Sequence, residues 1–490
     1  MLSPLFSQDA PGPDAISYRP AALAGAFYPA DPDTLRKRIN EYLDPDKAKR
    51  IRPEAAIHGI VVPHAGYDYS GWVAGRAFRE IEGRGYDAVV VIGPSHREVF
   101  EGASIYDGEA YTTPLGNAMI DQELADSIAA ADNTIMRSRK GHSHDRGNFE
   151  NSIEVQIPFL QVVLPDVPIV PIAMGAQNYH SSDVLMQAIV KAAEETGRRI
   201  LLVGSTDLSH YHDVTGAREM DIPLVQTFDN YDYMKLSYKL FAREWEACGA
   251  APMIAVMLTA EQLGANNATP LLYATSAEAP GVKTSDDRVV GYMSGLLMEA
   301  DFDPFGKFPE LDEEERARLL EAAKESVSRS VGADTTAEPG VRLVDKDLSG
   351  QYAAFVTLKK EGQLRGCMGH TIAEKNLLME VEESARMAAT RDMRFRPVAP
   401  DELDSLDFEI TVLSRFKRVL DTAEVEPGRD GVYLRLGRSA GLFLPQVATE
   451  QGWDREALLE NLGQKAGLSQ NAYQMPEAEL FIFRSLIIEE

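Results

Sequence analysis

Cysteine is nearly absent from this sequence of 490 residues, which contains only Cys248 and Cys367. Two thiols so far apart exclude a disulfide framework and are typical of the reducing cytoplasm, where we expect the protein to reside. Basic residues are also scarce: 49 Lys and Arg face 76 Asp and Glu, which gives a net charge of −27. A nonspecific nucleic-acid binder needs the opposite balance to neutralise phosphates, so no nucleic-acid partner is expected.

Long apolar runs are missing as well. No segment approaches the roughly 18 consecutive apolar residues of a membrane span, so no membrane association is expected. The opening MLSPLFSQDAPGPDAISYRP lacks the basic start and apolar core of a signal peptide, and we interpret residues 1–19 as a flexible lead-in. The composition, 44% hydrophobic and 26% charged, is that of a globular protein, and the length predicts more than one domain.

From residue 20 to 300 the chain alternates short apolar runs with helical patterns. Strands are predicted at IHGIVVPH, YDAVVVIGPSH, VPIVPIAMG and RRILLVGSTDLSH, and a helix ending in glycine at SDVLMQAIVKAAEETG. This alternation predicts an α/β domain over residues 20–300, with a central, partly parallel sheet and flanking helices.

Near residue 300 the pattern changes. FDPFGKFPE, within residues 301–310, is interpreted as a linker, and a helix start follows at LDEEERARLL. QYAAFVTLKK and DFEITVLS are predicted strands, GADTTAEPG a loop. Residues 311–490 are therefore predicted to form a smaller α+β domain that folds independently of the first.

Histidines follow three of the predicted strands. His64 comes after GIVVP, His96 after VVVIGPS, and Asp207, His210 and His212 after LLVGST. Because the carboxyl ends of parallel strands share one edge of a sheet, these side chains are candidates to converge. Neutral imidazoles beside a carboxylate and a thiol suit a transition metal. The alternative is that each histidine only caps a loop or bonds a backbone carbonyl.

Other polar groups have simpler interpretations. His142, His144 and Asp145 precede an amphipathic helix and are read as a solvated loop. Cys248 lies among alanines near an expected helix end, where a lone cysteine is usually a small buried hydrophobe.

The order of several motifs resembles the Memo family over residues 20–300. They are AGAFYPADPDTLRKRI, VVPHAGYDYSG, VIGPSH, TTPLGNAMID, ENSIEVQIPFL, GSTDLSHY, ACGAAPM and VVGYMSGLL. Members of this family are similar in fold to class III extradiol dioxygenases, which hold non-haem Fe(II). The resemblance implies that His64, His96 and Cys248 are metal ligands, with His210 as acid/base and Asp207 as its orienting partner. Fe(II) is favoured, and the soft thiolate makes copper or zinc competitive.

One position departs from the family pattern. Asn151 stands in ENSIEVQ where the family usually has histidine, and an amide hydrogen-bonds a ligand but cannot transfer a proton at neutral pH. Either His142 or His144 substitutes for it, or that acid/base function is lacking.

The remainder, from about residue 310 to 490, resembles the AMMECR domain through GQLRGCMGH, MRFRPVAPDELDSLDFEITVLS and DGVYLRLGRSAGLFLPQVATEQGWDREALLENLGQKAGL. Memo-like and AMMECR-like proteins accompany a radical SAM protein in the AmmeMemoRadiSam system, so the resemblance implies a radical SAM partner. Arg365, Cys367 and His370 form a possible second site, either binding an anion or supplying a nucleophile. The alternative is a tight glycine turn with the thiol packed inward.

Two functions follow. One is a metal-dependent, dioxygenase-like oxidoreductase acting on an unidentified small molecule at the sheet edge. The other is a non-catalytic metal-binding or scaffold protein that uses an enzyme-derived pocket. A metal-dependent hydrolase is less favoured, because no bridging Asp/Glu ligand set is evident.

Overall fold

The computed structural model describes most of the chain, namely residues 17–44, 50, 54–145, 147–301, 303, 305, 308–332, 348 and 350–489. The chain divides into two compact units, residues 1–301 and 302–490. Most of the expected lead-in, parts of the expected linker and nearly all of the predicted loop GADTTAEPG lie outside the described residues. Among the described residues, no helix combines the length and apolar character needed to cross a bilayer.

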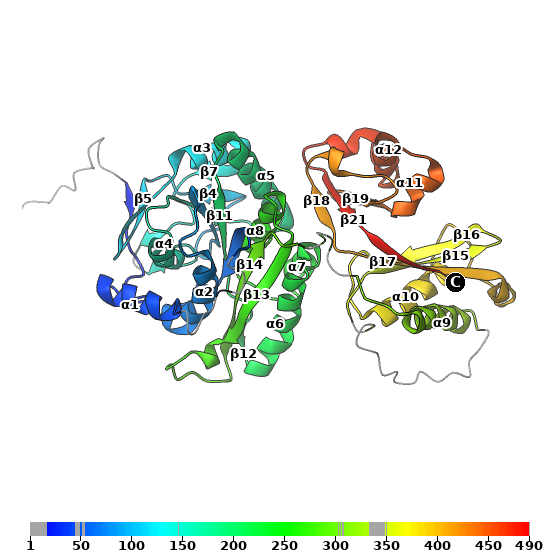
Figure 1. Ribbon diagram of the computed structural model, residues 1–490, viewed down its shortest axis with the longest axis horizontal. Helices are drawn as coiled ribbons and strands as arrows, with labels where there is room; N and C mark the ends of the chain where they lie inside the picture. The colour runs from blue at the N-terminus through cyan, green and yellow to red at the C-terminus, as the bar shows by residue number, and fades with distance from the viewer. Residues whose placement is uncertain are drawn as a thin grey trace, which may run out of the picture. The chain divides into compact units, whose positions relative to one another are not determined.

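A nine-stranded mixed sheet forms the centre of the first unit, in the order β12-β14-β2-β11-β3-β10-β4-β7, with β13 paired to β14 (Figure 1). The four parallel strands at its centre are those predicted from apolar runs: β2 (Ile57–Val62), β11 (Ile200–Ser205), β3 (Ala88–Pro94) and β10 (Ile169–Met174). They are buried almost throughout, which explains why they read as continuous Val/Ile runs rather than alternating patterns.

Antiparallel pairing of β14 with β2 and of β4 with β10 extends the sheet on both sides. The flanking strands are β12 (His210–His212), β13 (Asn267–Thr275), β14 (Val289–Met298), β4 (Ala103–Ile105) and β7 (Ile135–Arg137). A small separate sheet contains β1 (Tyr18–Arg19), β5 (Ala110–Thr113) and β6 (Gly116–Met119). An antiparallel pair is made by β8 (His144–Asp145) and β9 (Asn148–Phe149).

Helices cover both faces of the large sheet. One layer holds α1 (Pro32–Tyr42), α2 (Tyr67–Ile81) and α4 (Ile157–Val163). The other holds α3 (Gln122–Ala131), α5 (Tyr179–Thr196), α6 (Val214–Asp229), α7 (Tyr233–Phe241) and α8 (Ala250–Gln262). The predicted helix, α5, ends at Gly197 in the left-handed conformation, φ +64°. Gly59 and Gly204 present no side chain to α8, so Val256 packs directly on β2 and β11.

The second unit is α+β, as predicted, and smaller. Its first sheet has the order β16-β15-β17-β22, made of β16 (Gln363–Gly369), β15 (Ala354–Lys360), β17 (Leu406–Leu413) and β22 (Ser485–Glu489). Against it pack α9 (Glu313–Ser330) and α10 (Leu377–Thr390). The predicted start of α9 is confirmed by a capping box between Asp312 and Glu315.

A second four-stranded sheet completes this unit, in the order β18-β21-β19-β20. Its strands are β18 (Lys417–Val419), β21 (Glu479–Phe483), β19 (Gly431–Leu436) and β20 (Ser439–Phe443). The helices α11 (Pro445–Gln451) and α12 (Arg455–Lys465) cover its apolar side chains.

Each unit has its own buried core, and this generates a prediction. Residues 1–301 and residues 302–490, expressed separately, should each unfold cooperatively, because each unit contains hydrophobic clusters made of its own buried side chains. Circular dichroism during thermal unfolding would measure this, with the intact chain as control. A fragment that unfolds without a cooperative transition until the other is added would contradict the prediction.

Candidate metal centre

Side chains with metal-binding chemistry meet at one edge of the first unit's sheet. The neighbouring parallel strands β2, β11 and β3 lead into His64, Asp207 and His96, respectively. The ligand atoms of His64, His96 and Cys248 all lie within 4.8 Å of one another, and so do those of Asp207, His210 and Cys248. The convergence expected from the strand ends is therefore present, and Cys248 belongs to both sets.

Cys248 lies just before α8 rather than at a helix end. The glycine and proline that follow were expected to end a helix, but Gly249 is the N-cap of α8 and the proline lies in its first turn. A Cβ on Gly249 would lie 2.2 Å from the Ser205 carbonyl oxygen, so glycine is needed for α8 to begin this close to β11. The thiol sulfur is 3.0 Å from His64 Nε2, and the backbone N–H of Asp207 donates to it at 3.3 Å. Burial raises the pKa of the Cys248 thiol.

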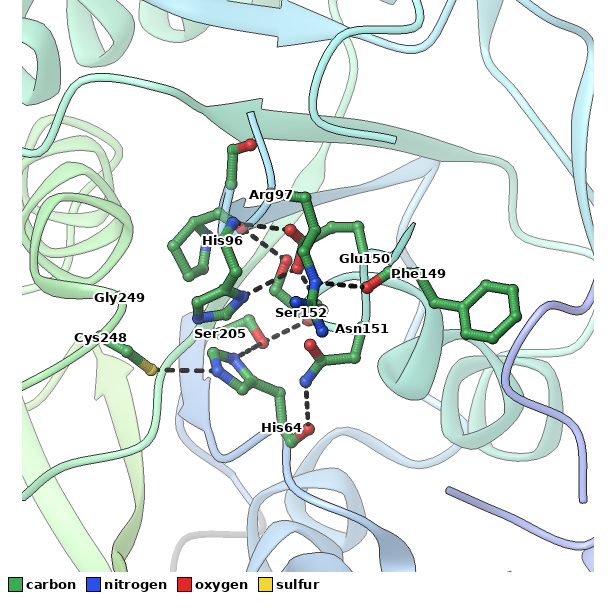
Figure 2. Close-up of polar contacts among 12 residues, drawn as sticks. His64, His96, Arg97, Phe149, Glu150, Asn151, Ser152, Ser205, Cys248 and Gly249 are labelled. Carbon is green, nitrogen blue, oxygen red and sulfur yellow. Dashed lines mark hydrogen bonds and ion pairs between the residues drawn. The ribbon is translucent and has the colours of Figure 1, made fainter. Parts of the chain in front are cut away.

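The hydrogen bonds of His64 fix its tautomer. Ser205 Oγ donates its proton to the Ser152 carbonyl at 2.5 Å and accepts from Gln156 Nε2 at 2.9 Å. It therefore accepts from His64 Nδ1, 3.0 Å away, and Nδ1 carries the hydrogen. Burial, followed by the neighbouring His96, lowers the pKa of His64 to about 3. His64 thus presents a neutral imidazole whose Nε2 lone pair faces Cys248 (Figure 2).

His96 is oriented by Glu150. This carboxylate accepts from the His96 backbone N–H at 2.6 Å and contacts Nδ1 at 2.9 Å. Burial alone would raise the pKa of Glu150, but the hydrogen bonds from His96 and Ser152 and the His96 charge lower it to about 2. An ionised carboxylate only accepts, so His96 Nδ1 must donate, and in the neutral imidazole Nε2 then carries the lone pair. The His64 and His96 rings meet edge to face, with centroids 5.1 Å apart.

His210 is held in the same tautomer by a backbone carbonyl. Its Nδ1 lies 2.7 Å from the Leu208 oxygen, and its backbone N–H donates to Glu246 at 3.1 Å. Leu208 thus holds the His210 ring, while the Asp207 carboxylate accepts from the His64 backbone N–H at 2.7 Å; the orienting role expected for Asp207 stays a prediction. Burial raises the pKa of Asp207 to about 6.

Three residues that position the histidines were missed by the sequence analysis: Glu150, Ser205 and Gln156. Each lies inside one of the motifs ENSIEVQ and LLVGSTDLSH, in which only the histidines, Asp207 and Asn151 were assigned roles. Only Ser205 carried a signal, because a polar residue at the end of an otherwise apolar strand needs a buried partner, whereas Glu150 and Gln156 lie in a largely polar motif.

His142, one of the two histidines considered as a replacement for the family's histidine at position 151, is committed to other contacts. His142 is buried and bonds the Tyr111 hydroxyl and the Ser104 carbonyl, so reading it as solvated was wrong. His144 pairs within β8 and β9. Asn151 itself reaches the centre, where its Nδ2 donates to the His64 carbonyl at 3.0 Å.

The possible second site at Arg365, Cys367 and His370 stays a prediction. The motif holding them is a strand, β16, rather than a tight turn: a Cβ on Gly366 would lie 2.3 Å from the Ala388 oxygen, so α10 packs on the bare glycine. Each candidate has separate neighbours, with Arg365 bonded to Glu402, Cys367 to Thr357 and Asp392, and His370 to Glu380. Burial raises the pKa of the Cys367 thiol, which disfavours a nucleophilic role.

His142 makes the stability of the first unit depend on pH. Burial lowers its pKa to about 4, so the unfolded chain binds a proton below about pH 6.5 that the folded chain refuses. Stability should therefore fall as the pH drops from 6.5 toward 4, by roughly 3 kcal/mol from this group. Urea unfolding in a Trp453→Phe background, where Trp72 and Trp245 report on the first unit, would measure it. His142→Gln should lose less stability over this window than the parent; equal losses would contradict the prediction.

Comparisons with known proteins match these two units. A family model described as Memo-like protein matches residues 19–296, and one described as AMMECR1 matches residues 320–488. The chain is 32% identical over 287 residues to a MEMO1 family protein of Methanobrevibacter smithii, covering 57% of this chain and 99% of that protein. It is 35% identical over 289 residues to a MEMO1 family protein of Pyrobaculum arsenaticum, covering 57% and 98%.

Among solved structures, the crystal structure of an uncharacterized protein from Pyrococcus horikoshii is 28% identical with a TM-score of 0.34, covering 37% of this chain and 93% of that one. The Memo-like match alone spans more than half of the sequence and includes every histidine and cysteine of the candidate centre. The chain therefore belongs to the Memo family and carries an AMMECR1 domain after its Memo-like domain.

Proposed function

We propose that the Memo-like domain binds one transition metal ion through His64, His96 and Cys248 and acts as a dioxygenase-like oxidoreductase on a small molecule. The observation that carries the proposal is that one ligand atom from each of these three side chains lies within 4.8 Å of the other two. Both imidazoles are already in the tautomer that a metal ligand requires.

The donor set fits a transition metal. Bonds of about 2.0–2.3 Å from nitrogen and sulfur to one ion place neighbouring donors some 3–4 Å apart, which the spacing here accommodates. Two imidazoles and a thiolate also leave positions open for other ligands. Fe(II) is proposed from the family resemblance, while the soft sulfur keeps copper and zinc as alternatives. When bound, a redox-active metal supplies electron exchange and a binding point for a substrate oxygen.

The chain's own residues supply proton chemistry beside this centre. His210 holds its hydrogen on Nδ1 toward Leu208, so Nε2 is available to accept a proton from a ligand in the pocket. Asp207 fixes the backbone of His64, and its raised pKa places it near the range for proton exchange at neutral pH. A buried carboxyl group and a half-buried imidazole thus lie next to the proposed ligands.

A second candidate function is metal binding without catalysis. Asn151 favours it, because its amide is already committed to the His64 carbonyl and offers no proton transfer. In that case the fused AMMECR1 domain, together with a radical SAM partner proposed from the family resemblance, would use the loaded domain as a docking or delivery module.

Metal content separates ligands from bystanders. Full-length protein loaded with Zn²⁺ and freed of excess should lose most of its metal in His64→Ala and in His96→Ala, because two remaining protein ligands hold an ion weakly. Elemental analysis per chain measures this, and His180→Ala, at an exposed histidine on α5, is the matched control. Cys248→Ser should lose metal as well, whereas a merely buried cysteine would cost stability alone. Full occupancy in both histidine variants would refute the assignment.

His210 is expected to serve the pocket without holding the metal. His210→Ala should still bind metal nearly stoichiometrically, with at most about a 10- to 100-fold weaker affinity, while oxygen uptake by the iron-loaded protein falls sharply. His212→Ala, at the other end of β12, is the control. A His210→Ala protein as metal-free as His64→Ala would instead make His210 a metal ligand and overturn its assignment as an acid/base beside the metal.

A further inference from the structure

Arg19 is a buried arginine that the site described so far does not use. It lies in the two-residue strand β1, paired in register with Tyr111 of β5, and only 1% of it is exposed. Its guanidinium forms an ion pair with Glu154, which is fully buried, and stacks over the Tyr111 ring at 4.8 Å. Glu154 in turn accepts from the Leu23 backbone N–H at 2.8 Å.

The remaining guanidinium hydrogens hold one segment of backbone. Nε donates to the His142 carbonyl at 3.0 Å, and Nη2 donates to the carbonyls of Ser143 and Glu150 at 3.0 and 2.9 Å. Together with the ion pair to Glu154, these hydrogen bonds hold the start of this segment, at residues 142 and 143, and its second half, at residues 150 and 154. This is the segment that delivers Glu150 to the centre.

Glu150 connects the two networks directly. Its carbonyl oxygen accepts from Arg19, while its carboxylate accepts from the backbone N–H and Nδ1 of His96. Both sets of hydrogen bonds belong to the same residue. A shift of the Glu150 backbone therefore moves the carboxylate that sets the His96 tautomer. No other arginine among the described residues bonds this carbonyl.

We propose that Arg19 is a positioning residue for His96, acting through the Glu150 backbone, and so tunes the metal affinity of the centre. This inference rests on the proposed metal-binding function for its main readout. Arg19 holds the carbonyl that anchors Glu150, and Glu150 holds His96 with Nε2 facing Cys248.

The choice of arginine supports this role. A guanidinium presents five donors in a rigid fork and can hold an ion pair and several carbonyls at once, whereas an ammonium is a compact point charge with three donors. A buried ion pair by itself is weak support for stability, because desolvation cancels much of the attraction. What Arg19 adds beyond charge is therefore geometry: three carbonyls of one segment held by one planar group.

A double-mutant cycle on the full-length chain tests the proposal. Zn²⁺ affinity, measured by competition with a chromophoric chelator, should fall about 10- to 100-fold in Glu150→Gln and by up to about tenfold in Arg19→Lys. In the Glu150→Gln background, Arg19→Lys should cause no further loss, because its route to His96 is already broken. Equal losses in both backgrounds would overturn the proposal, as would an unchanged affinity in a folded Arg19→Lys protein.

A control variant separates loss of metal affinity from general loss of stability. Leu35→Ala removes a fully buried side chain of α1 and should lower the melting temperature while leaving Zn²⁺ affinity at the wild-type value. If Leu35→Ala weakens Zn²⁺ binding as much as Arg19→Lys does, the Arg19 effect is general destabilisation and the proposal fails.

A metal-free readout keeps the inference distinct from the proposed function. In protein labelled with ¹⁵N-histidine, His96 should show a single Nδ1–H tautomer, and Arg19→Lys should convert it to a mixture. That result, in a protein that binds no Zn²⁺, would refute metal binding and uphold the positioning role. An unchanged His96 tautomer in Arg19→Lys would overturn the positioning role whether or not metal binds.

Discussion

The hydrogen bond at Nδ1 of each imidazole is the interaction on which the centre depends. His64 donates to Ser205, His96 to Glu150 and His210 to Leu208, and none of these acceptors has a proton to give back at that contact. A neutral imidazole has one donor and one acceptor nitrogen, so fixing the hydrogen on Nδ1 leaves Nε2 with a lone pair. These three Nε2 lone pairs are the nitrogen acceptors that the centre offers to a ligand.

Those acceptors require the sheet. Ser205 is the last residue of β11, which lies between β2 and β3. Its hydroxyl accepts from His64, which follows β2, and donates to the Ser152 carbonyl, on the side of β3. Parallel strands place these ends at one edge, and α8 brings Cys248 to the same edge because Gly249 allows its close approach. The three proposed ligands therefore come from three separate parts of the chain: the ends of β2 and β3 and the start of α8.

The sequence predicts the features of the centre that local patterns determine. It does not predict those that depend on contacts between residues far apart in the chain. The apolar runs of β2 and β3 determine both the strands and the edge at which His64 and His96 emerge, so the convergence was accessible from local pattern and topology. Glu150 was not accessible, because its partner is 54 positions away and its own segment is irregular. Cys248 was misplaced at a helix end because glycine and proline mark both the N-terminus and the region after the C-terminus of a helix. Gly366 was read as a turn residue although its role is to admit α10 against a strand, a contact that only tertiary packing reveals.

The protonation states of His64 and Cys248 link the burial of the centre to metal binding. Burial keeps His64 neutral and Cys248 protonated, so the folded domain hides these groups from water in their uncharged forms. A metal ligand must be deprotonated: His64 already is, whereas Cys248 must release its proton first. The backbone N–H of Asp207 aimed at the sulfur, and the position before the first turn of α8, favour the thiolate once a cation is near. Because burial keeps the Cys248 thiol protonated, cation binding through the proposed ligands would release a proton, and Asp207 and His210 are the neighbouring groups with atoms that can accept it.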